Sequence, residues 1–547
     1  MVLAAALVLN VQLGADALTS DFGFTNDAQS QTARDLVEER FGTSFQEVLV
    51  VKSETLVVED EAFRQRVESA YDLIVESGGI EPIQPHFYLT GDEQFVSGDR
   101  RTLIVPFSIT GELDAAIEIV EPVLEEVIAL NGQGGFFVAM VGEISFAIES
   151  NELSVSDIEQ GEQVGVPMAL VILLFLFGAV VAALVPLFLA IVSIIVALGM
   201  VAVIGQFFEL VFFVTLMISM IGLAVGIDYS LIVVSRFREE LGKGRNKLEA
   251  IEVAGATASR TVLFSGLTVV LALTGMLIVP ATIFQSLGLG AILVVVAAVL
   301  AALTLLPAAL ALMGTKVNAL RIPFVGRKLS QGSASDSAGG FWGTVTNVVM
   351  SYPVLALLIF GGLMAAAAYP VRDLETGFNG VDVLPDRLQT KQAFLVLEKE
   401  FSFGVAAPVD IVVDGDASDP AVMGVVQELR ASLAEDPDFI GFSTVSISES
   451  GDLTILSVPV AGETSSERAV SAVRRLRDDI VPAAFAGVPA VGYVGGSTSQ
   501  NIDFFDITDR FTPIVFVFVL GLSFILLTVA FRSIVIPLKS IILNLLS

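Results

Sequence analysis

The sequence predicts a polytopic α-helical membrane protein with two α+β domains outside the membrane, each of ferredoxin-like βαββαβ order. Hydrophobic residues make up 54% of the 547 residues and charged residues 16%, with a mean hydropathy of +0.79, which is too apolar for a soluble protein. The formal net charge of −31 arises mainly in residues 16–162 and 372–510, and the rest of the chain consists largely of apolar runs. Segments of one half recur in the other, which indicates a duplicated architecture.

The composition narrows the classes of function. The chain has no Cys and a single His, so it cannot form a disulfide, a thiolate metal site or a His relay. No motif typical of an ATPase or a metalloprotease occurs, and we expect no enzyme activity, no catalytic residue, no metal ion and no cofactor. The negative charge argues against nucleic acid as a partner, because phosphate binding requires a basic surface.

Seven apolar runs are long enough to predict complete transmembrane helices. These runs lie near Val164–Ala183, Leu187–Phe207, Leu210–Val234, Thr261–Val279, Ile283–Met313, Pro353–Tyr369 and Pro513–Phe531. The runs Val2–Leu13 and Ile534–Leu546 are too short to span a bilayer, so we interpret both chain ends as lying within a helix. A signal peptide is an alternative for the first run, but it lacks the basic residues and the cleavage site of such a peptide.

Two basic loops, Arg236–Lys247 and Lys316–Lys328, adjoin apolar runs and predict the cytoplasmic side of an inner (cytoplasmic) membrane. Both acidic blocks are then extracytoplasmic. The expected domains are a partial helix 1 (1–15), a first extracytoplasmic domain (16–162), helices 2–6 (163–313), a cytoplasmic linker (314–345), helix 7 (346–371), a second extracytoplasmic domain (372–511) and helix 8 with a partial helix 9 (512–547).

Recurring segments predict that the two halves are duplicates. The matching pairs are Ser97–Pro106 (SGDRRTLIVP) with Ser450–Pro459 (SGDLTILSVP), Ala33–Phe41 with Ala393–Phe401, and Pro186 with Pro537. We place the two prolines in the turns that follow the second and eighth helices. Residues equivalent to the third to sixth helices are mostly absent from the second half, which predicts a truncated second repeat.

Within each acidic block, patterns of period 2 and period 3.6 alternate as βαββαβ. The first block predicts strands at Val48–Val51, Ile80–Leu89, Thr102–Ile109 and Phe136–Val141, with helices at Asp60–Glu76 and Leu113–Leu130. The second predicts strands at Asp410–Val413, Ile440–Ile447, Leu453–Val460 and Ala490–Val494, with helices at Pro420–Glu435 and Ser465–Ile480. This order is typical of one sheet covered by two helices.

Asp228 is the one acidic residue inside a predicted complete span, about eight residues, or roughly 12 Å, from Arg236 at the cytoplasmic boundary. A charged carboxylate in a bilayer is costly, which favours a neutral form that can gain and lose a proton. We therefore predict an ion-coupling site at Asp228. The alternative, a merely tolerated Asp, is less favoured because this short side chain does not reach the interface.

The residues around Asp228 offer further groups. Gly222 and Gly226 form a GxxxG pattern, for which helix packing is the simpler interpretation. The hydroxyl of Tyr229 suits either a role in transport or packing. Ser265 and Thr268 on the next span are candidate relay neighbours, although such hydroxyls often bond to the carbonyl four residues earlier in their own helix.

Several motifs resemble the MMPL branch of the resistance-nodulation-division (RND) transporter superfamily. They are Gly222–Leu241 (GLAVGIDYSLIVVSRFREEL), Ala258–Val270 (ASRTVLFSGLTVV), Ser286–Val296 (SLGLGAILVVV), the run that ends at Leu310, and the final FRSIVIPLKSIILNLLS. The resemblance covers essentially the whole chain in order. It implies twelve helices, two extracytoplasmic porter domains after helices 1 and 7, and proton-driven export of lipidic or amphiphilic molecules.

The resemblance also assigns roles. An Asp–Tyr pair on helix 4 of that family carries the proton relay, and its match here is Asp228–Tyr229. The family pattern has a second Asp–Tyr pair on helix 10, whereas this sequence stops in helix 9, so we expect a two-repeat RND architecture that lacks helices 10–12. The expected energy source is the proton gradient, and the expected contacts are a lipidic substrate, membrane lipids, and an oligomer or partner subunit that supplies the missing helices.

Two other functions remain open at this stage. Bundles of this superfamily also resemble sterol-sensing domains, which bind lipid as sensors or scaffolds without transporting it, and the chain is alternatively an inactive fragment. Asp228 favours the transporter, because a sensor has no need of a buried ionisable group. No linear motif identifies the substrate or the oligomeric state.

Overall fold

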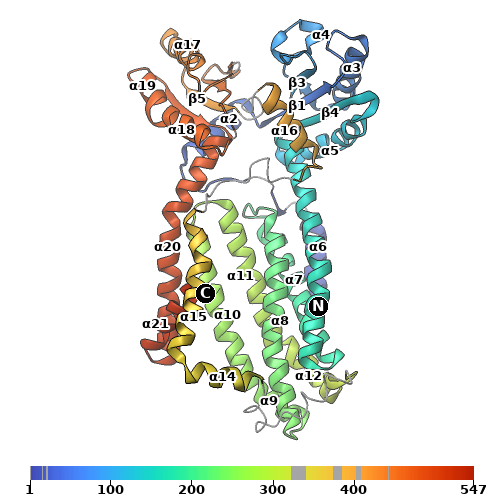
Figure 1. Cartoon of the computed structure of the whole chain (residues 1–547), viewed down its shortest axis with the longest axis vertical. Helices are drawn as coiled ribbons and strands as arrows, with labels where there is room; N and C mark the ends of the chain where they lie inside the picture. Colours follow the sequence, from blue (N-terminus) through green and yellow to red (C-terminus); the bar gives the residue numbers. More distant parts are fainter. Residues whose placement is uncertain are drawn as a thin grey trace. The chain divides into compact units, whose positions relative to one another are not determined.

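The computed structural model describes residues 2–14, 17–19, 22–321, 341–373, 385–401, 408–440, 443–462 and 464–546. They form two compact units, each assembled from separate stretches of the chain (Figure 1). The helical unit comprises Met1–Phe22, Ile158–Glu375 and Asp509–Ser547, and the α/β unit comprises Gly23–Asp157 and Thr376–Thr508. Residues 322–340, most of the expected linker, lie outside the described residues.

Six helical segments among the described residues are long and apolar enough to cross a membrane. They are α7 (Val180–Ile204), α8 (Phe213–Gly242), the segment Lys247–Ile278 with α9 (Lys247–Ala254) and α10 (Arg260–Leu273), the segment Thr282–Asn318 with α11 (Thr282–Leu303) and α12 (Leu305–Met313), the segment Pro353–Arg372 with α15 (Pro353–Ala368), and α20 (Ser497–Phe531). The helical unit also contains α1 (Val2–Leu13), α14 (Phe341–Ser351), α21 (Val535–Leu546) and the apolar end of α6 (Glu143–Phe177).

Small residues allow the central helices of this unit to pack closely. A Cβ atom at Gly290 of α11 would lie 2.3 Å from the Val214 side chain of α8, and one at Gly199 of α7 would lie 2.7 Å from the Cα of Ala6 in α1. The core of the helical unit therefore lies where α8 packs against α7 and α11 (Figure 1).

The helix boundaries differ from the expectation at two points. The predicted span Val164–Ala183 is divided, because Gly178 has a φ of +62° and ends α6 before α7 begins. Pro186 and Pro537 lie inside α7 and α21, so their predicted placement in turns is wrong. Pro186 costs α7 one backbone hydrogen bond, which packing against neighbouring helices allows an apolar helix to accommodate, whereas Pro537 lies in the first turn of α21, where the N–H group has no partner within the helix.

The α/β unit contains two four-stranded antiparallel sheets with the same topology, in the orders β2-β3-β1-β4 and β6-β7-β5-β8. The first subdomain consists of β1 (Ser44–Ser53), α3 (Glu61–Glu76), β2 (Ile80–Pro82), β3 (Thr102–Thr110), α5 (Leu113–Leu130) and β4 (Phe136–Gly142). The second consists of β5 (Val409–Asp414), α17 (Pro420–Ala434), β6 (Thr444–Ile447), β7 (Leu453–Val458), α18 (Glu467–Arg475) with α19 (Val481–Ala484), and β8 (Val491–Gly495). The elements follow one another as the periodicities predict.

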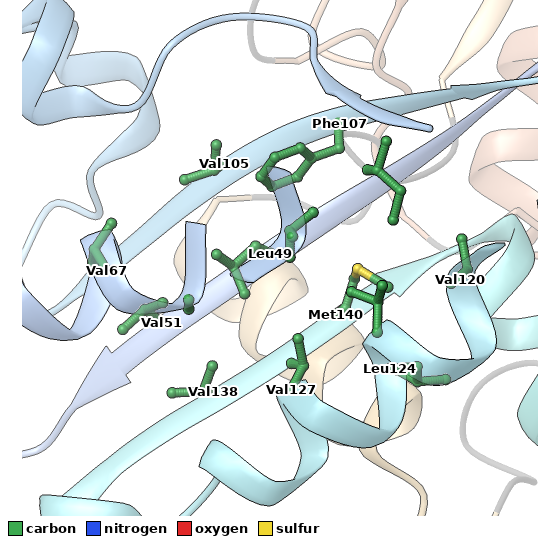
Figure 2. Close-up of a cluster of buried hydrophobic side chains, with 14 of the residues drawn as sticks. Leu49, Val51, Val67, Val105, Phe107, Val120, Leu124, Val127, Val138 and Met140 are labelled. Atoms are coloured by element: carbon green, nitrogen blue, oxygen red, sulfur yellow. The ribbon is translucent and has the colours of Figure 1, made fainter. Parts of the chain in front are cut away.

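Helices α3 and α5 cover one face of the first sheet. Buried residues of α3 recur at helical spacing, with Phe63, Val67, Ala70 and Ile74 on one side. Figure 2 shows this core, in which side chains of the two helices meet alternate residues of the strands. The labelled residues are Val67 from α3, Val120, Leu124 and Val127 from α5, and Leu49, Val51, Val105, Phe107, Val138 and Met140 from the sheet.

The predicted strand Ile80–Leu89 is only partly a strand. Pairing with β3 covers Ile80–Pro82, and Phe87–Thr90 forms the short helix α4. Pro82 and Pro85 explain the early end, because proline has no N–H group to donate to a sheet.

Two helices without a predicted role are exchanged between the subdomains. Helix α2 (Gln29–Phe41), from the first half, packs on β5, β7 and β8 of the second sheet, with Ala33 beside Val412 and Leu453. Helix α16 (Gln389–Glu400), from the second half, packs on the first sheet, where Ala393 and Leu397 join the buried cluster of β1 and β4. Each sheet is therefore covered on one face by the other half of the chain.

The structure also corrects the register of the repeated SGD motif. The Ser97 hydroxyl accepts the Thr102 N–H at 2.9 Å, and the Ser448 hydroxyl accepts the Leu453 N–H at 3.1 Å in the same manner. Ser97 thus corresponds to Ser448 and not to Ser450. The backbone supports the same register, because the positive-φ residues Arg100 (φ 58°) and Gly451 (φ 72°) each lie three residues after these serines.

Candidate functional site

Asp228 lies near the middle of α8, on the side of the helix that faces away from the core of the helical unit. Gly222, Gly226, Tyr229 and Val233 recur at helical spacing and are buried, whereas Asp228 is exposed. Successive residues of a helix point to different sides, so Asp228 directs its carboxylate outward and Tyr229 directs its phenol inward.

Tyr229 contacts α10 through its hydroxyl. Its side chain is hydrogen-bonded to that of Ser265, and Asp228 is close enough to act on it electrostatically. A Cβ atom at Gly266 would lie 3.6 Å from the Tyr229 hydroxyl oxygen and 2.3 Å from Val299 of α11. Gly266, which sequence reasoning missed, thus leaves room for Val299 of α11, and a glycine beside Ser265 within a helix was the available signal.

The other candidate hydroxyls bond within their own helices. Thr268 donates to the carbonyl of Phe264 at 2.8 Å, and Ser230 donates to the carbonyl of Gly226 at 2.6 Å. The structure therefore brings Ser265 to Tyr229 and places the Thr268 hydroxyl against its own backbone.

The two glycines of the GxxxG pattern face α7. A Cβ atom at Gly226 would lie 2.6 Å from the Cα of Ala190, and one at Gly222 would lie 2.5 Å from the Ile194 side chain. Larger side chains at Gly226 would have to displace backbone atoms, whereas Ile194 has some freedom to move. This close approach determines which face of α8 packs on α7, and Asp228 lies on the opposite face.

A charged cluster closes the end of α8 that leads to α9. The Glu240 side chain is 1% exposed and lies 2.8 Å from the Lys243 amine, 3.1 Å from Arg245 and 3.2 Å from Arg236. Arg236 also pairs with Glu239 at 2.7 Å. The sequence predicted only that this basic loop marks the cytoplasmic side, whereas in the structure three of its cations surround one buried carboxylate, because a buried charge requires compensation.

The α/β unit contains two carboxylates at equivalent strand positions, of which Glu47 is fully buried and Asp410 is half-buried. Glu47, opposite Gly142, accepts the N–H groups of Ile144 and Ser145 at 2.8 and 2.9 Å, and burial raises its pKa to about 7. Asp410, opposite Gly495, accepts the Ser457 hydroxyl at 2.5 Å, and burial likewise raises its pKa. Among the described residues, no group of three His, Cys, Asp or Glu is placed to hold a metal ion.

The family model of the MMPL family matches residues 24–355 and 391–547. The mycolic acid-containing lipids exporter MmpL11 of Mycolicibacterium smegmatis is 31% identical over 454 residues, which cover 82% of this chain and 47% of that protein. The heme uptake protein MmpL11 of Mycobacterium tuberculosis is 29% identical, with 76% and 42% covered. The trehalose monomycolate exporter MmpL3 of M. smegmatis is 26% identical, with 78% and 44% covered.

The chain spans about half the length of the curated relatives it matches. The family match extends over most of the sequence and includes α8 with Asp228 and Tyr229. Together with the six apolar helices among the described residues, it identifies a multi-pass membrane protein. The chain belongs to the MMPL family.

Proposed function

We propose that this protein takes part in proton-driven transport of lipidic or amphiphilic molecules, with Asp228 as the group that binds and releases the proton. The observation that carries the proposal is the position of Asp228 in an apolar helix, with its carboxylate exposed beside the bonded pair Tyr229–Ser265. An ionisable side chain at membrane depth marks an ion pathway by default, since only function offsets its cost.

In this mechanism, a proton from outside neutralises Asp228, and the neutral side chain tolerates a less polar environment than the carboxylate does. The hydrogen bond between Tyr229 and Ser265 holds the phenol in place. A change of charge on the neighbouring Asp228 therefore alters the contact between α8 and α10. One charge that crosses the membrane provides about 2.3 kcal/mol per 100 mV, which is enough to bias such a movement. The two subdomains of the α/β unit act as extracytoplasmic porter domains that open and close a path for the substrate.

The exposed side of Asp228 requires a cover. A carboxylate facing lipid is costly, and Ala224, Phe264 and Leu267 are exposed together with it. We propose that helices equivalent to those of the first repeat, from a longer chain, a second copy or a partner subunit, pack on this face and bring a second relay group to Asp228. Two coupled carboxylates would link proton occupancy to helix movement.

The substrate class is inferred from the relatives. Two of them are named as exporters of mycolic acid-containing lipids and of trehalose monomycolate, both amphiphilic, and one is named for heme uptake. Each of these names refers to a large molecule with apolar and polar parts. We propose that the cargo is a molecule of this class, and the proposal is not restricted to one head group.

Proton transport by the purified protein tests the proposal. Proteoliposomes of phosphatidylethanolamine and phosphatidylglycerol enclose the pH dye pyranine, and proton entry is followed after a pH step. Asp228→Asn should abolish protein-dependent entry, whereas Glu209→Gln, at the exposed turn before α8, should not. Entry at the same rate through Asp228→Asn would remove Asp228 from the mechanism. Binding of lipid with no proton entry by the wild type would favour the sensor or scaffold.

A second assay addresses the cargo. The gene is expressed in M. smegmatis that lacks its own MmpL11, and mycolic acid-containing lipids are extracted from the cell surface. Restored lipid that depends on Asp228 supports lipid export. Restored proton entry without restored lipid would separate proton coupling from this substrate class.

A further inference from the structure

The second sheet ends in a strand whose outer edge has no partner among the described residues. Strand β6 (Thr444–Ile447) pairs on one side with β7 and is the last strand in the order β6-β7-β5-β8. The strand contains neither a charged residue nor a proline, and Thr444, Ser446 and Ile447 are exposed, the last to 48%. Such an edge is open to pairing with another strand, and most proteins block it.

The duplicated first subdomain blocks its corresponding edge. Strand β2 ends at Pro82, and the chain then leaves the sheet to form α4. The N–H group of the next residue, Ile83, bonds to the Pro106 carbonyl, so Pro82 itself faces the outer side of the sheet. A proline has no N–H group to offer a further strand there. The same fold thus carries a block at β2 that it lacks at β6.

The pairing of β6 with β7 determines which backbone groups point to the open side. The Ser448 N–H donates to the Leu453 carbonyl at 2.9 Å. Residues of an antiparallel strand direct their backbone groups alternately to its two sides, so Ser446 also bonds to β7. Val445 and Ile447 therefore present their N–H and C=O groups to the open side.

These groups are complementary to a second copy of themselves. When two β6 strands run antiparallel about a twofold axis at Ser446, Val445 of each copy lies opposite Ile447 of the other. Each of these pairs exchanges two N–H···O=C bonds. The side chains match as well, because β-branched residues meet at Val445 and Ile447 and the Ser446 hydroxyl meets its own counterpart.

The charges beside the strand match in the same arrangement. Ser443 precedes β6, and its hydroxyl accepts the Nε–H of Arg430 from α17 at 2.9 Å. In the pairing about Ser446, Glu449 of one copy lies opposite Ser443 of the other and therefore close to that copy's Arg430. Glu449 and Arg430 are both exposed, so each copy offers one carboxylate and one guanidinium to the other. A second copy of this chain thus fits the edge in hydrogen bonds, side chains and charge.

We propose that two copies of the protein associate through β6, so that their second sheets form one continuous antiparallel sheet. The association goes beyond the proposed function, because it requires neither Asp228 nor a proton gradient. It also differs from the cover proposed for Asp228, since it joins α/β units and not helical units.

Cysteine cross-linking tests the proposal, because the chain has no Cys of its own. As a non-hydrogen-bonded pair, Ser446 and its counterpart would have Cα atoms about 4.5 Å apart, within the range of about 4.4–6.8 Å for a disulfide. Ser446→Cys, oxidised in membranes with copper phenanthroline, should give a reducible species of twice 57.8 kDa. Thr444→Cys, on the same face of the strand, is the matched control, since its counterpart would be about 14 Å away.

Further changes in the Ser446→Cys variant break the pairing or restore it. Val445→Pro removes an N–H group from the open side and none from the ladder with β7, so this variant should fold and lose the cross-link. Glu449→Arg should also lose it, and Glu449→Arg/Arg430→Glu should recover it, because the two charges are exchanged. The melting temperature of each variant in detergent verifies folding.

Three outcomes would overturn the proposal. One is the absence of a cross-link in Ser446→Cys, and another is equal cross-linking of Ser446→Cys and Thr444→Cys, which indicates random collision. The third is a cross-linked species of a different mass, which would mean that β6 binds another protein and not a second copy.

Discussion

The carboxylate of Asp503, in the first turns of α20, accepts hydrogen bonds from both the backbone N–H of Ser30 at 3.0 Å and its hydroxyl at 2.6 Å. Ser30 lies at the start of α2, so a carboxylate of the second half caps the exchanged helix of the first half. The other half repeats the arrangement, because Glu149 of α6 accepts the N–H and hydroxyl of Thr390 at the start of α16. The exchange of the two helices is thus fixed by a reciprocal pair of caps.

Loss of the Asp503 carboxylate should destabilise the α/β unit strongly. Arg477 pairs with Asp503 at 2.6 Å, and the two side chains are 15% and 9% exposed. Asp503→Ala leaves that cation buried without a partner and should reduce the free energy of unfolding by about 3 kcal/mol. Thermal unfolding in detergent measures the change.

Asp506→Ala is its control, because the pair Arg474–Asp506 is exposed to 44% and 49% and should contribute at most about 1 kcal/mol. Equal losses in the two variants would contradict the buried cap.

A methyl group at Gly226 should disrupt the helical unit. The added Cβ would lie 2.6 Å from the Cα of Ala190, and a backbone atom cannot move aside as a side chain can. Gly226→Ala should lower the yield of folded protein in detergent by size-exclusion chromatography. Gly361→Ala in α15, where a Cβ meets no atom within 4 Å, should fold at least as well as wild type, since alanine favours helix. Normal folding of both variants would argue against the close α7–α8 contact.

Glu47 should make the stability of the α/β unit depend on pH. Burial raises its pKa from 4.5 to about 7, so the folded state binds the proton more tightly than the unfolded state. The stability from this group is fully present below pH 4.5 and is lost as the pH rises to 7, by roughly 3 kcal/mol in total. Glu47→Gln retains an oxygen for the Ile144 and Ser145 N–H groups and should abolish this dependence.

The measurement is the difference in melting temperature between Glu47→Gln and wild type at several pH values. The melting temperature of the variant should rise relative to that of wild type as the pH increases from 5 to 8. Above pH 8 the difference should stay constant. A constant difference over this range would mean that Glu47 does not titrate there.

Gly451 should resist substitution because its φ of 72° is strained for residues with a side chain. Gly451→Ala should cost about 1 kcal/mol of unfolding free energy. Gly424→Ala, in the middle of α17 with no atom within 4 Å of the added Cβ, should instead be neutral or stabilising. Urea titration measures the unfolding free energy of both variants, and a Gly451→Ala variant as stable as wild type would mean that this turn accepts a side chain at positive φ, as it does at Arg100.

Local patterns were sufficient to predict many elements of the fold. Leu113–Leu130 matches α5 at both ends, because its apolar residues repeat with helical period. The strand predicted at Thr102–Ile109 is β3, extended by one residue. The boundary between α6 and α7 was missed, because an apolar run contains no sign that Gly178 adopts a positive φ.

Contacts between distant residues could not be predicted in this way. The segment Ala33–Phe41 was identified only as a repeat of Ala393–Phe401, and neither its helix nor the sheet on which it packs was predicted, since the partner residues belong to the other half. Glu240 looks solvent-exposed in sequence because its neighbours are charged, yet those same neighbours enclose it. At the candidate site, Asp228 and Ser265 were identified from residue type and position, the relay role of Tyr229 came from the family resemblance, and all three roles remain predictions.

The exchange of α2 and α16 also affects how the protein is made. A ribosome completes β1, β3 and β4 long before it reaches Gln389–Glu400, so one apolar face of the first sheet emerges without the helix that covers it. During that interval the nascent chain threads its membrane segments while Val48, Val50 and Ala139 await α16. Until the second half arrives, this uncovered apolar face is therefore a site where the unfinished protein is prone to aggregate.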